Sequence, residues 1–257
     1  MNALNIGSLK QYGYEAKNLR LAEKTWYCMG RSLVDTMKYI LFQMDVAYLA
    51  PLVTGAKLLC ANHPTTVDPV MMTTLVPEQV SILISETLFK VPGLGRSLAA
   101  SGHIRVEHNR GRAALETGIQ RLEAGRTVGI FPEGAISQAN GSMARAHTGA
   151  ARMALTTNVP VIPIGIAVNS KNILRIKTMV DGVEETGTWY LRGPYAITVG
   201  EAMFFDGDST RANDRETVHQ VTDQIAARIA ALSQESARRL EAARQPEYLS
   251  HPVRIQS

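Results

Sequence analysis

A histidine and an aspartate stand five residues apart directly after a short apolar run, in the stretch LLCANHPTTVDPV of residues 58–70. A neutral imidazole accepts a proton through one ring nitrogen when an acceptor holds the other. A carboxylate does this and also stabilises the imidazolium that forms. The intervening turn is long enough for one side chain to fold back on the other. The spacing therefore indicates a general base, His63, oriented by Asp68.

The same residues also have a purely structural interpretation. Asp68 followed by Pro69 is typical of a helix start, with the aspartate as N-cap and the proline at the first helical position. A single histidine in a turn is commonly a surface residue. Spacing alone leaves both interpretations open.

A second apolar run leads into a turn of proline, an acid and glycine, in TVGIFPEGAISQANGS at residues 127–142. Proline and glycine are ordinary turn residues at such a point. Glu133 has two interpretations here: it binds a hydroxyl of an acceptor, or it anchors the loop that does.

The middle of the chain carries an excess of positive charge. Residues 88–126 contain seven lysine or arginine residues and three glutamates, and this excess equals the formal net charge of +4 of the whole chain. A solvated helix face explains some of these cations, Arg121 and Arg126 among them. Arg105 and Arg110 flank the end of another apolar run, so we predict that they hold an anion.

Apolar runs of strand length alternate with helical patterns from residue 57 onward. The predicted strands are residues 57–61, 80–85, 103–107, 127–131, 159–168 and 195–200. The predicted helices are residues 69–76, 111–124, 148–157 and 214–243. This alternation predicts an α/β fold with a largely parallel central sheet flanked by helices. Sheets of this kind bind ligands at the carboxyl ends of their strands, where His63 and Glu133 are expected to lie.

One α/β domain is predicted over residues 51–245, with the long C-terminal helix closing it and a loose tail at 246–257. An amphipathic helical segment precedes it at residues 1–50, and one helix is predicted over 26–50. Apolar residues recur in that helix at steps of three and four: Met29, Leu33, Met37, Ile40, Met44 and Tyr48. This helix either covers the core or lies among lipid headgroups at a membrane interface.

Composition restricts the partners and the compartment. The net charge of +4 and a pI of about 9.1 favour acidic partners such as anionic lipid, a phosphorylated substrate or nucleic acid. Few aromatic residues and no long basic run argue against nucleic acid. Cys28 and Cys60 form no metal-binding pattern, so no metal is predicted and a reduced cytosolic setting is expected. Neither a signal peptide nor a membrane-spanning segment is expected.

Four short motifs occur in the order found in the glycerolipid acyltransferase family, which includes 1-acylglycerol-3-phosphate (lysophosphatidate) acyltransferase. The first, N-H-x-x-x-x-D, is matched by Asn62, His63 and Asp68. GHIRVEH resembles the glycine-led second block, FPEGAIS matches F-P-E-G-x-x-S, and VPVIPI is similar to the fourth block. The resemblance covers about residues 57–200, and four ordered blocks are a specific signal.

This resemblance implies transfer of a fatty acyl group from a thioester donor, acyl-CoA or acyl-carrier protein, to a hydroxyl of a lysolipid. The first acceptor to consider is 1-acylglycerol-3-phosphate. His63 would remove the proton of the hydroxyl as its oxygen attacks the thioester, and Asp68 would orient His63. No cofactor and no covalent acyl-enzyme are expected. The expected substrate-binding residues are Arg105, Arg110, Glu133, Gly134, Ser137 and His147.

Two departures from the family pattern concern the phosphate of the acceptor. His108 stands where the second block usually ends in arginine, and Ile136 stands where arginine often precedes the serine of the third block. Neither side chain replaces a guanidinium fork, although Arg105, Arg110 or His147 could compensate. The alternatives are therefore a lysolipid without a phosphomonoester, an amino-lipid hydroxyl, or a lipid-binding protein of the same fold without turnover.

The N-terminal region commonly faces the membrane in this family, which favours the interfacial interpretation of residues 10–48. The resemblance thus implies a peripheral membrane enzyme of phospholipid biosynthesis at the cytoplasmic face. An ordinary hydrolase is disfavoured because the sequence has no G-x-S-x-G elbow.

Overall fold

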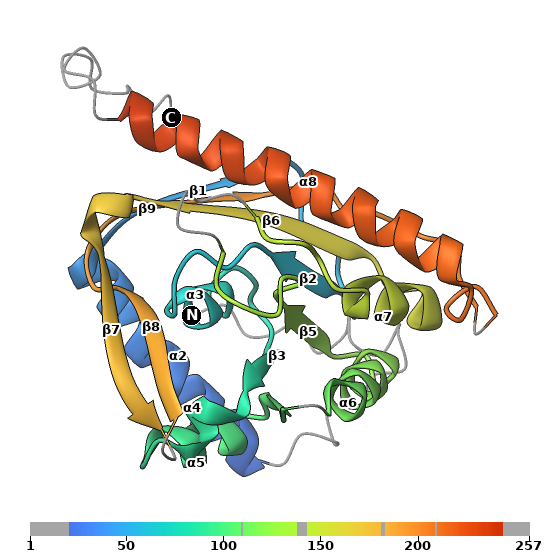
Figure 1. Cartoon of the computed structure of the whole chain (residues 1–257), viewed down its shortest axis with the longest axis horizontal. Helices are drawn as coiled ribbons and strands as arrows, with labels where there is room; N and C mark the ends of the chain where they lie inside the picture. The colour runs from blue at the N-terminus through green and yellow to red at the C-terminus, as the bar shows by residue number, and fades with distance from the viewer. Residues whose placement is uncertain (1–20, 109, 138–142, 181–182, 209, 244–257) are drawn as a thin grey trace.

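The computed structural model describes residues 21–108, 110–137, 143–180, 183–208 and 210–243. Seven strands form one sheet in the order β1-β9-β6-β2-β5-β3-β4, and a separate hairpin pairs β7 with β8 (Figure 1). The strands of the sheet are β1 Phe42–Tyr48, β2 Leu58–Ala61, β3 Val80–Ser85, β4 Ile104–Val106, β5 Thr127–Ile130, β6 Val161–Val168 and β9 Gly193–Val199. The hairpin strands are β7 Ile173–Val180 and β8 Val183–Tyr190.

The helices lie around this sheet, as predicted. They are α2 Leu21–Leu41, α3 Asp68–Met72, α4 Glu86–Lys90, α5 Leu94–Ala100, α6 Gly111–Glu123, α7 Gly149–Thr157 and α8 Arg215–Ala242, with a short 3-10 turn η2 at Ser170–Asn172. Every pairing in the sheet is parallel except that of β6 with β9, so the prediction of an α/β fold with a largely parallel sheet is confirmed.

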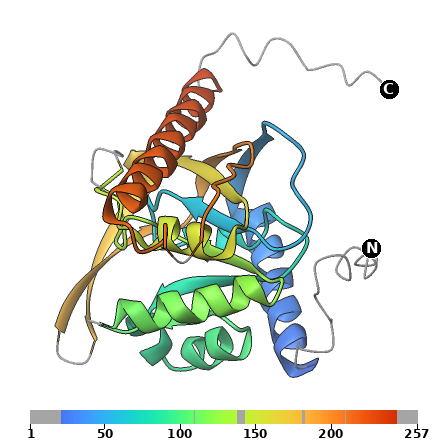
Figure 2. The ribbon, with the colours of Figure 1, turned by 90° about the vertical axis from the view of Figure 1, so that its right-hand side faces the viewer.

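The central strand β2 is buried along its whole length, which explains its continuous apolar sequence. Leu58 and Cys60 pack on one face of the sheet with residues of α6, α7 and α8, and Figure 2 shows α6 and α7 side by side in green and yellow-green. Leu59 and Ala61 pack on the other face with residues of α3. Both faces of the sheet are therefore covered. The edge formed by the carboxyl ends of the parallel strands is where a site is expected.

The long helix α8 crosses β6 and β9 at close range. Gly165 makes this approach possible, because a Cβ atom added there would lie 2.1 Å from the backbone carbon of Leu232. The predicted helix over 214–243 is confirmed, and Asp214 is its N-cap, accepting a hydrogen bond from the Thr217 backbone N–H at 2.8 Å. The predicted tail at 246–257 lies outside the described residues.

The prediction of one helix over residues 26–50 is wrong at its C-terminal end. The helix α2 ends at Leu41, and residues 42–48 form β1, which pairs in parallel with β9. Apolar and polar residues alternate in FQMDVAY, which is a strand pattern that the stripe of methionines and leucines upstream had obscured. The α2 stripe itself faces outward, with Met29 59% and Leu33 63% exposed.

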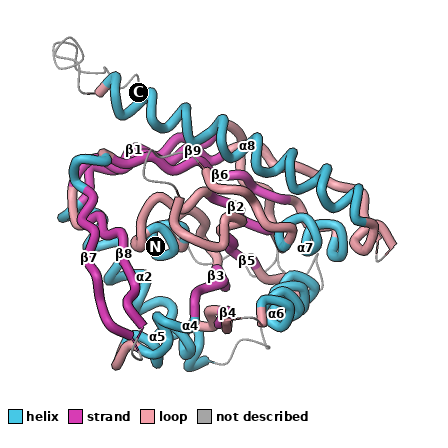
Figure 3. The backbone as a smooth tube through the Cα atoms, viewed as in Figure 1, coloured by secondary structure: helices cyan, strands magenta, loops and turns pink. Residues whose placement is uncertain are grey.

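The hairpin of β7 and β8 was not predicted, and neither were α4 and α5. Arg175 and Lys177 interrupt the apolar residues of β7, so the sequence lacks the continuous run that marks a buried strand. Figure 3 shows the hairpin leaving the sheet and running past α3 towards α4 and α5. Within the described residues, no helix combines the length and the apolar character that crossing a bilayer requires.

Candidate active site

His63 and Asp68 are in contact at the carboxyl end of β2. The Nδ1 atom of His63 lies 2.9 Å from Oδ2 of Asp68, and the aspartate side chain is fully buried while the imidazole is 16% exposed. Phe131, which follows β5, stacks on the imidazole with ring centroids 4.2 Å apart. Since Nδ1 faces the carboxylate, the second ring nitrogen, Nε2, is the one that can take a proton from another molecule.

Asp68 does not act as a helix cap, although it begins α3 and is followed by proline as the structural interpretation supposed. The N-cap position is Val67, and no side chain caps the helix. The Asp68 carboxylate turns back instead. It accepts hydrogen bonds from the Thr65 backbone N–H and the Thr65 hydroxyl, both at 2.6 Å, and from the Tyr195 hydroxyl at 2.5 Å. Its bonds thus hold the turn that carries His63 together and tie that turn to β9.

Glu133 braces the backbone of His63. One of its carboxylate oxygens accepts the His63 backbone N–H at 2.8 Å and the Ser137 hydroxyl at 2.6 Å, and the other accepts the Ala144 backbone N–H at 2.6 Å. The glutamate is 3% exposed. Of the two interpretations of Glu133, this geometry favours the anchor of the loop over a direct ligand of the acceptor.

Ser137 belongs to the same brace. Its backbone N–H donates to the His63 carbonyl at 2.8 Å, and its hydroxyl lies 3.1 Å from the His63 backbone nitrogen. The turn after β5 is therefore tied to the turn after β2 by both main chain and side chain. Ser137 is buried, and its hydroxyl and backbone N–H bond to Glu133 and His63.

Gly134 and His147 lie against each other at the rim of this turn. Gly134 has a φ of +65°, which favours glycine, and a Cβ added there would lie 3.0 Å from Cδ2 of His147. The exposed His147 is held by its backbone N–H, which donates to the Pro132 carbonyl at 2.7 Å. Of the three residues expected to hold an anion, Arg105, Arg110 and His147, it is His147 that adjoins the turn that touches His63.

Asn62 fixes the end of β2 from the other side. Its side-chain amide pairs with the backbone of Ile166 in β6, accepting at 2.7 Å and donating at 2.9 Å, and it lies 3.3 Å from the Ser233 hydroxyl of α8. The asparagine of the first motif is therefore a buried clamp between β2, β6 and α8.

Arg105 and Arg110 share the carboxyl edge of the sheet with His63 but are not brought into contact with it. Strands β5 and β3 lie between β2 and β4, so β4 is three strand spacings away, roughly 14 Å. The Arg105 guanidinium lies over the Phe89 ring at 5.0 Å, and Arg110 is paired with Glu107 at 3.2 Å.

The two residues that depart from the family pattern are found in different settings. His108 is exposed just after β4, where its backbone N–H donates to Glu86 at 3.2 Å. Ile136 is partly buried next to Ser137 in the turn after β5. The chain therefore supplies no arginine at either of these two positions.

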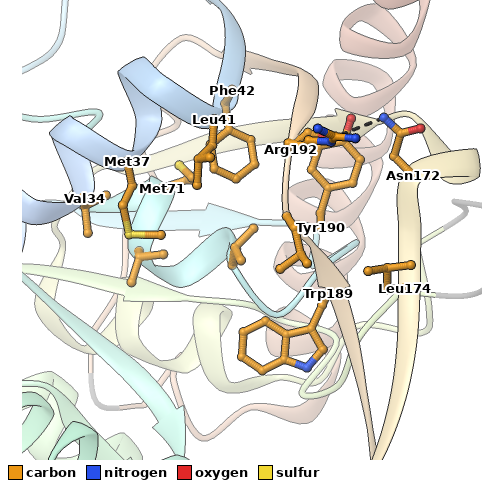
Figure 4. Close-up of a pocket in the computed structure, with 13 residues that line it drawn as sticks. Val34, Met37, Leu41, Phe42, Met71, Asn172, Leu174, Trp189, Tyr190 and Arg192 are labelled. Atoms are coloured by element: carbon orange, nitrogen blue, oxygen red, sulfur yellow. Dashed lines mark hydrogen bonds between the residues drawn. The ribbon is translucent and has the colours of Figure 1, made fainter.

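An apolar groove of about 710 Å³ lies alongside the turn that carries the pair: Val67 of that turn lines it, whereas His63 and Asp68 do not. Figure 4 shows its walls: Val34, Met37 and Leu41 of α2 face Leu174, Trp189 and Tyr190 of the hairpin. Asn172 and Arg192 supply polar groups to the lining. The volume lies in the range of roughly 300–1,000 Å³ that small-molecule sites occupy.

Sequence reasoning missed Tyr195, Thr65 and the hairpin wall of the groove. Thr65 lies within the first motif, and a hydroxyl three residues before a buried aspartate is a usable local signal. Tyr195 is 127 residues away in the chain, and nothing in its neighbourhood indicates contact with Asp68. The hairpin reaches the site through Thr66, whose backbone N–H donates to the Thr188 carbonyl at 2.7 Å.

The fold and the site define an α/β protein in which a partly exposed histidine contacts a buried aspartate beside an apolar groove. Comparisons with known proteins bear on its fold and family. Residues 45–167 match the family model described as Acyltransferase. A 1-acyl-sn-glycerol-3-phosphate acyltransferase of Saccharomyces cerevisiae (strain ATCC 204508 / S288c) is 26% identical over 115 residues, which are 43% of this chain and 38% of the yeast protein. The chain thus spans well under half of that relative.

A solved structure has the same fold. The 1-acyl-sn-glycerophosphate (LPA) acyltransferase PlsC from Thermotoga maritima matches with a TM-score of 0.55 and 20% identity, over 86% of each chain. The resemblance to acyltransferases that the motifs predicted is confirmed over residues 45–167, which match the Acyltransferase family model. The comparisons also support the prediction of an acyltransferase enzyme.

Proposed function

We propose that the protein is an O-acyltransferase that moves a fatty acyl group from a thioester donor, acyl-CoA or acyl-carrier protein, to a hydroxyl of a lysolipid. The observation that carries this proposal is the contact of His63 with a fully buried Asp68 in a turn whose Val67 lines an apolar groove. A base and a place for an acyl chain are thus adjacent, and acyl transfer to an alcohol needs both.

In the proposed reaction, Nε2 of His63 removes the proton of the acceptor hydroxyl while the hydroxyl oxygen attacks the thioester carbonyl. The tetrahedral intermediate then expels the thiolate, and the imidazolium gives the proton to the leaving sulfur. Asp68 holds the imidazole by Nδ1 and stabilises its protonated form. Glu133 and Ser137 act by fixing the His63 backbone.

The apolar groove is the proposed site for an acyl chain. Its lining is almost entirely aliphatic, thioether or aromatic, and such a surface gains free energy from burying methylene groups, about 0.8 kcal/mol for each one. Val67, which lines the groove, stands directly before Asp68, so a chain in the groove would lie against the turn that carries the reacting groups.

The first acceptor proposed is 1-acylglycerol-3-phosphate, the substrate class named for the relatives. Its phosphate lies close to the reacting hydroxyl, whereas Arg105 belongs to β4, roughly 14 Å from β2. The guanidinium of Arg105 lies over Phe89, and Arg110 is paired with Glu107. His147 is nearer to the pair, because it adjoins Gly134. This placement keeps open the second candidate acceptor, a lysolipid or amino-lipid hydroxyl without a phosphomonoester.

The membrane is the proposed source of the acceptor. The outward stripe of α2 includes Met29, Leu33 and Ile40, with 59%, 63% and 70% of their surfaces exposed, and the hairpin adds Ile176 and Met179. These elements form the two walls of the groove, so a protein lying on them would open the groove towards lipid. We therefore propose a peripheral protein at the cytoplasmic face of a membrane.

The test is a panel of acceptors with release of free CoA or carrier-protein thiol as the readout. The panel contains 1-acylglycerol-3-phosphate, lysolipids with diester headgroups and a hydroxy amino-lipid. His63→Ala should lower transfer by about 10²- to 10⁴-fold, since it removes the general base. His219→Ala, a histidine of α8 outside the site, should behave as wild type.

A folded His63→Ala variant with wild-type turnover would defeat the mechanism. Strict dependence on a phosphomonoester would support the first acceptor and exclude the second. Binding to liposomes without cleavage of any thioester would instead favour a lipid-binding protein without turnover.

A further inference from the structure

Tyr195 reaches the carboxylate of Asp68 from β9, two strands away from β2 in the sheet. Its hydroxyl donates to Oδ1 at 2.5 Å, and both side chains are fully buried. The same oxygen accepts the Thr65 hydroxyl at 2.6 Å, while Oδ2 accepts the Thr65 backbone N–H at 2.6 Å and faces His63. One oxygen is thus satisfied by two hydroxyls, and the other is shared with the imidazole.

The tyrosine is held in this position by its neighbours. Phe42 meets its ring edge-on with centroids 5.9 Å apart, and the Tyr190 ring lies at 6.2 Å. Burial, and then the negative charge of Asp68, raise the pKa of the Tyr195 hydroxyl well above its usual value. The hydroxyl therefore stays protonated and remains a donor throughout the physiological range of pH.

A buried carboxylate that accepts few hydrogen bonds would make the neighbouring histidine a less effective general base. Its full charge would fall on His63, favour the imidazolium and leave less neutral base at neutral pH. Hydroxyl donors on the far oxygen take up part of that charge, as water would on an exposed carboxylate. Such a carboxylate can orient the ring while attracting its proton less strongly.

We propose that Tyr195, assisted by the Thr65 hydroxyl, is a positioning residue that fixes Asp68 and limits its pull on the His63 proton. This inference deepens the proposed function, on which its catalytic consequence rests. Its effect on the protonation of His63 is measurable without any acyl transfer.

The experiment compares Tyr195→Phe with the wild type by NMR titration of the His63 imidazole. The signal is assigned as the one that disappears in His63→Gln. Loss of one donor to Asp68 should raise the pKa of His63 by roughly half a unit or more. The acidic limb of the kcat/KM profile should move to higher pH by the same amount. Thr65→Val should act in the same direction.

Tyr190→Phe is the size-matched control for the pKa measurement. It removes a buried hydroxyl from the same aromatic cluster, but this hydroxyl donates to the Pro194 carbonyl at 2.7 Å. The inference requires an unchanged His63 pKa in this variant. An equal shift in Tyr190→Phe, or no shift in both Tyr195→Phe and Thr65→Val, overturns it.

The two proposals can fail separately. If Tyr195→Phe shifts the His63 pKa but the wild-type protein transfers no acyl group, the role of Tyr195 is supported and the proposed function is defeated. An unshifted pKa in an active acyltransferase would defeat the role of Tyr195 alone.

Discussion

At the scale of single residues, the imidazole of His63 is constrained from three directions. Asp68 holds Nδ1, Phe131 covers one face of the ring, and Glu133 accepts the backbone N–H. A residue with this many constraints keeps one orientation, which is what proton transfer in step with nucleophilic attack requires. The contacts of Glu133 with protein atoms make it part of this support.

Glu133→Gln tests the support directly. A glutamine cannot present acceptors to the N–H groups of His63 and Ala144 and to the Ser137 hydroxyl at once, so the His63 backbone should shift. Because a misplacement of about 1 Å can cost roughly 10²-fold, we expect kcat to fall about 10- to 100-fold with little change in KM. Steady-state kinetics on the purified enzyme measure this split.

Glu78→Gln is the matched control, because Glu78 pairs with Lys57 at the opposite end of β2. It should lower the midpoint of thermal unfolding and leave kcat close to that of the wild type. If Glu133→Gln raised KM strongly at constant kcat, Glu133 would be a ligand of the acceptor after all.

At the scale of elements, the groove depends on two parts of the chain that are distant in sequence. The helix α2 supplies one wall, and the hairpin of β7 and β8 supplies the other. The hairpin also bonds to the turn of the His63–Asp68 pair through Thr66 and Thr188, at 2.7 and 3.1 Å. A ligand that displaces the hairpin would therefore also displace that turn, because the two hydrogen bonds connect them.

Leu174→Trp should narrow the groove and shift the preference of the enzyme to shorter acyl chains. Leu174 lines the groove, whereas Met179, on the same strand and 67% exposed, does not. Met179→Trp should accordingly leave chain preference unchanged. The measurement is relative kcat/KM for a series of acyl donors and acceptors of different length. An unchanged series in Leu174→Trp would show that the acyl chain does not occupy this groove.

At the scale of the whole molecule, exposed apolar surface gathers on the elements that border the groove. The outward stripe of α2 is the larger part, and β7 contributes a smaller one. Contiguous apolar surface on a monomer commonly marks a membrane or protein contact. Its position beside the groove favours lipid as the partner.

Leu33→Glu should weaken binding to anionic phospholipid vesicles several-fold, because it places a charge in the middle of the stripe. Gln120→Glu adds the same charge at an exposed position of α6, outside the stripe and the groove, and should bind nearly as the wild type does. Co-sedimentation with vesicles at fixed ionic strength measures both. Equal binding by the wild type and Leu33→Glu would mean that α2 does not face the membrane.

The sequence by itself determined the alternation of strands and helices, the long C-terminal helix and the residues of the site that belong to local motifs. His63 with Asp68, and Glu133 with Ser137, stand close together in the chain, so each pair falls within one local motif, and the ordered motifs carried the prediction through their resemblance to the acyltransferase blocks. The same local signals could not show that Glu133 would turn to the His63 backbone, because that contact spans 70 residues.

The tertiary structure alone decided what lies around these motifs. Tyr195 meets Asp68 only because β9 is placed beside β6, and the groove exists only because the hairpin folds back towards α2. The change from helix to strand at Phe42 was likewise set by pairing with β9. Periodicity reports how a segment buries its own side chains, whereas these contacts depend on which distant segments share a face of the sheet.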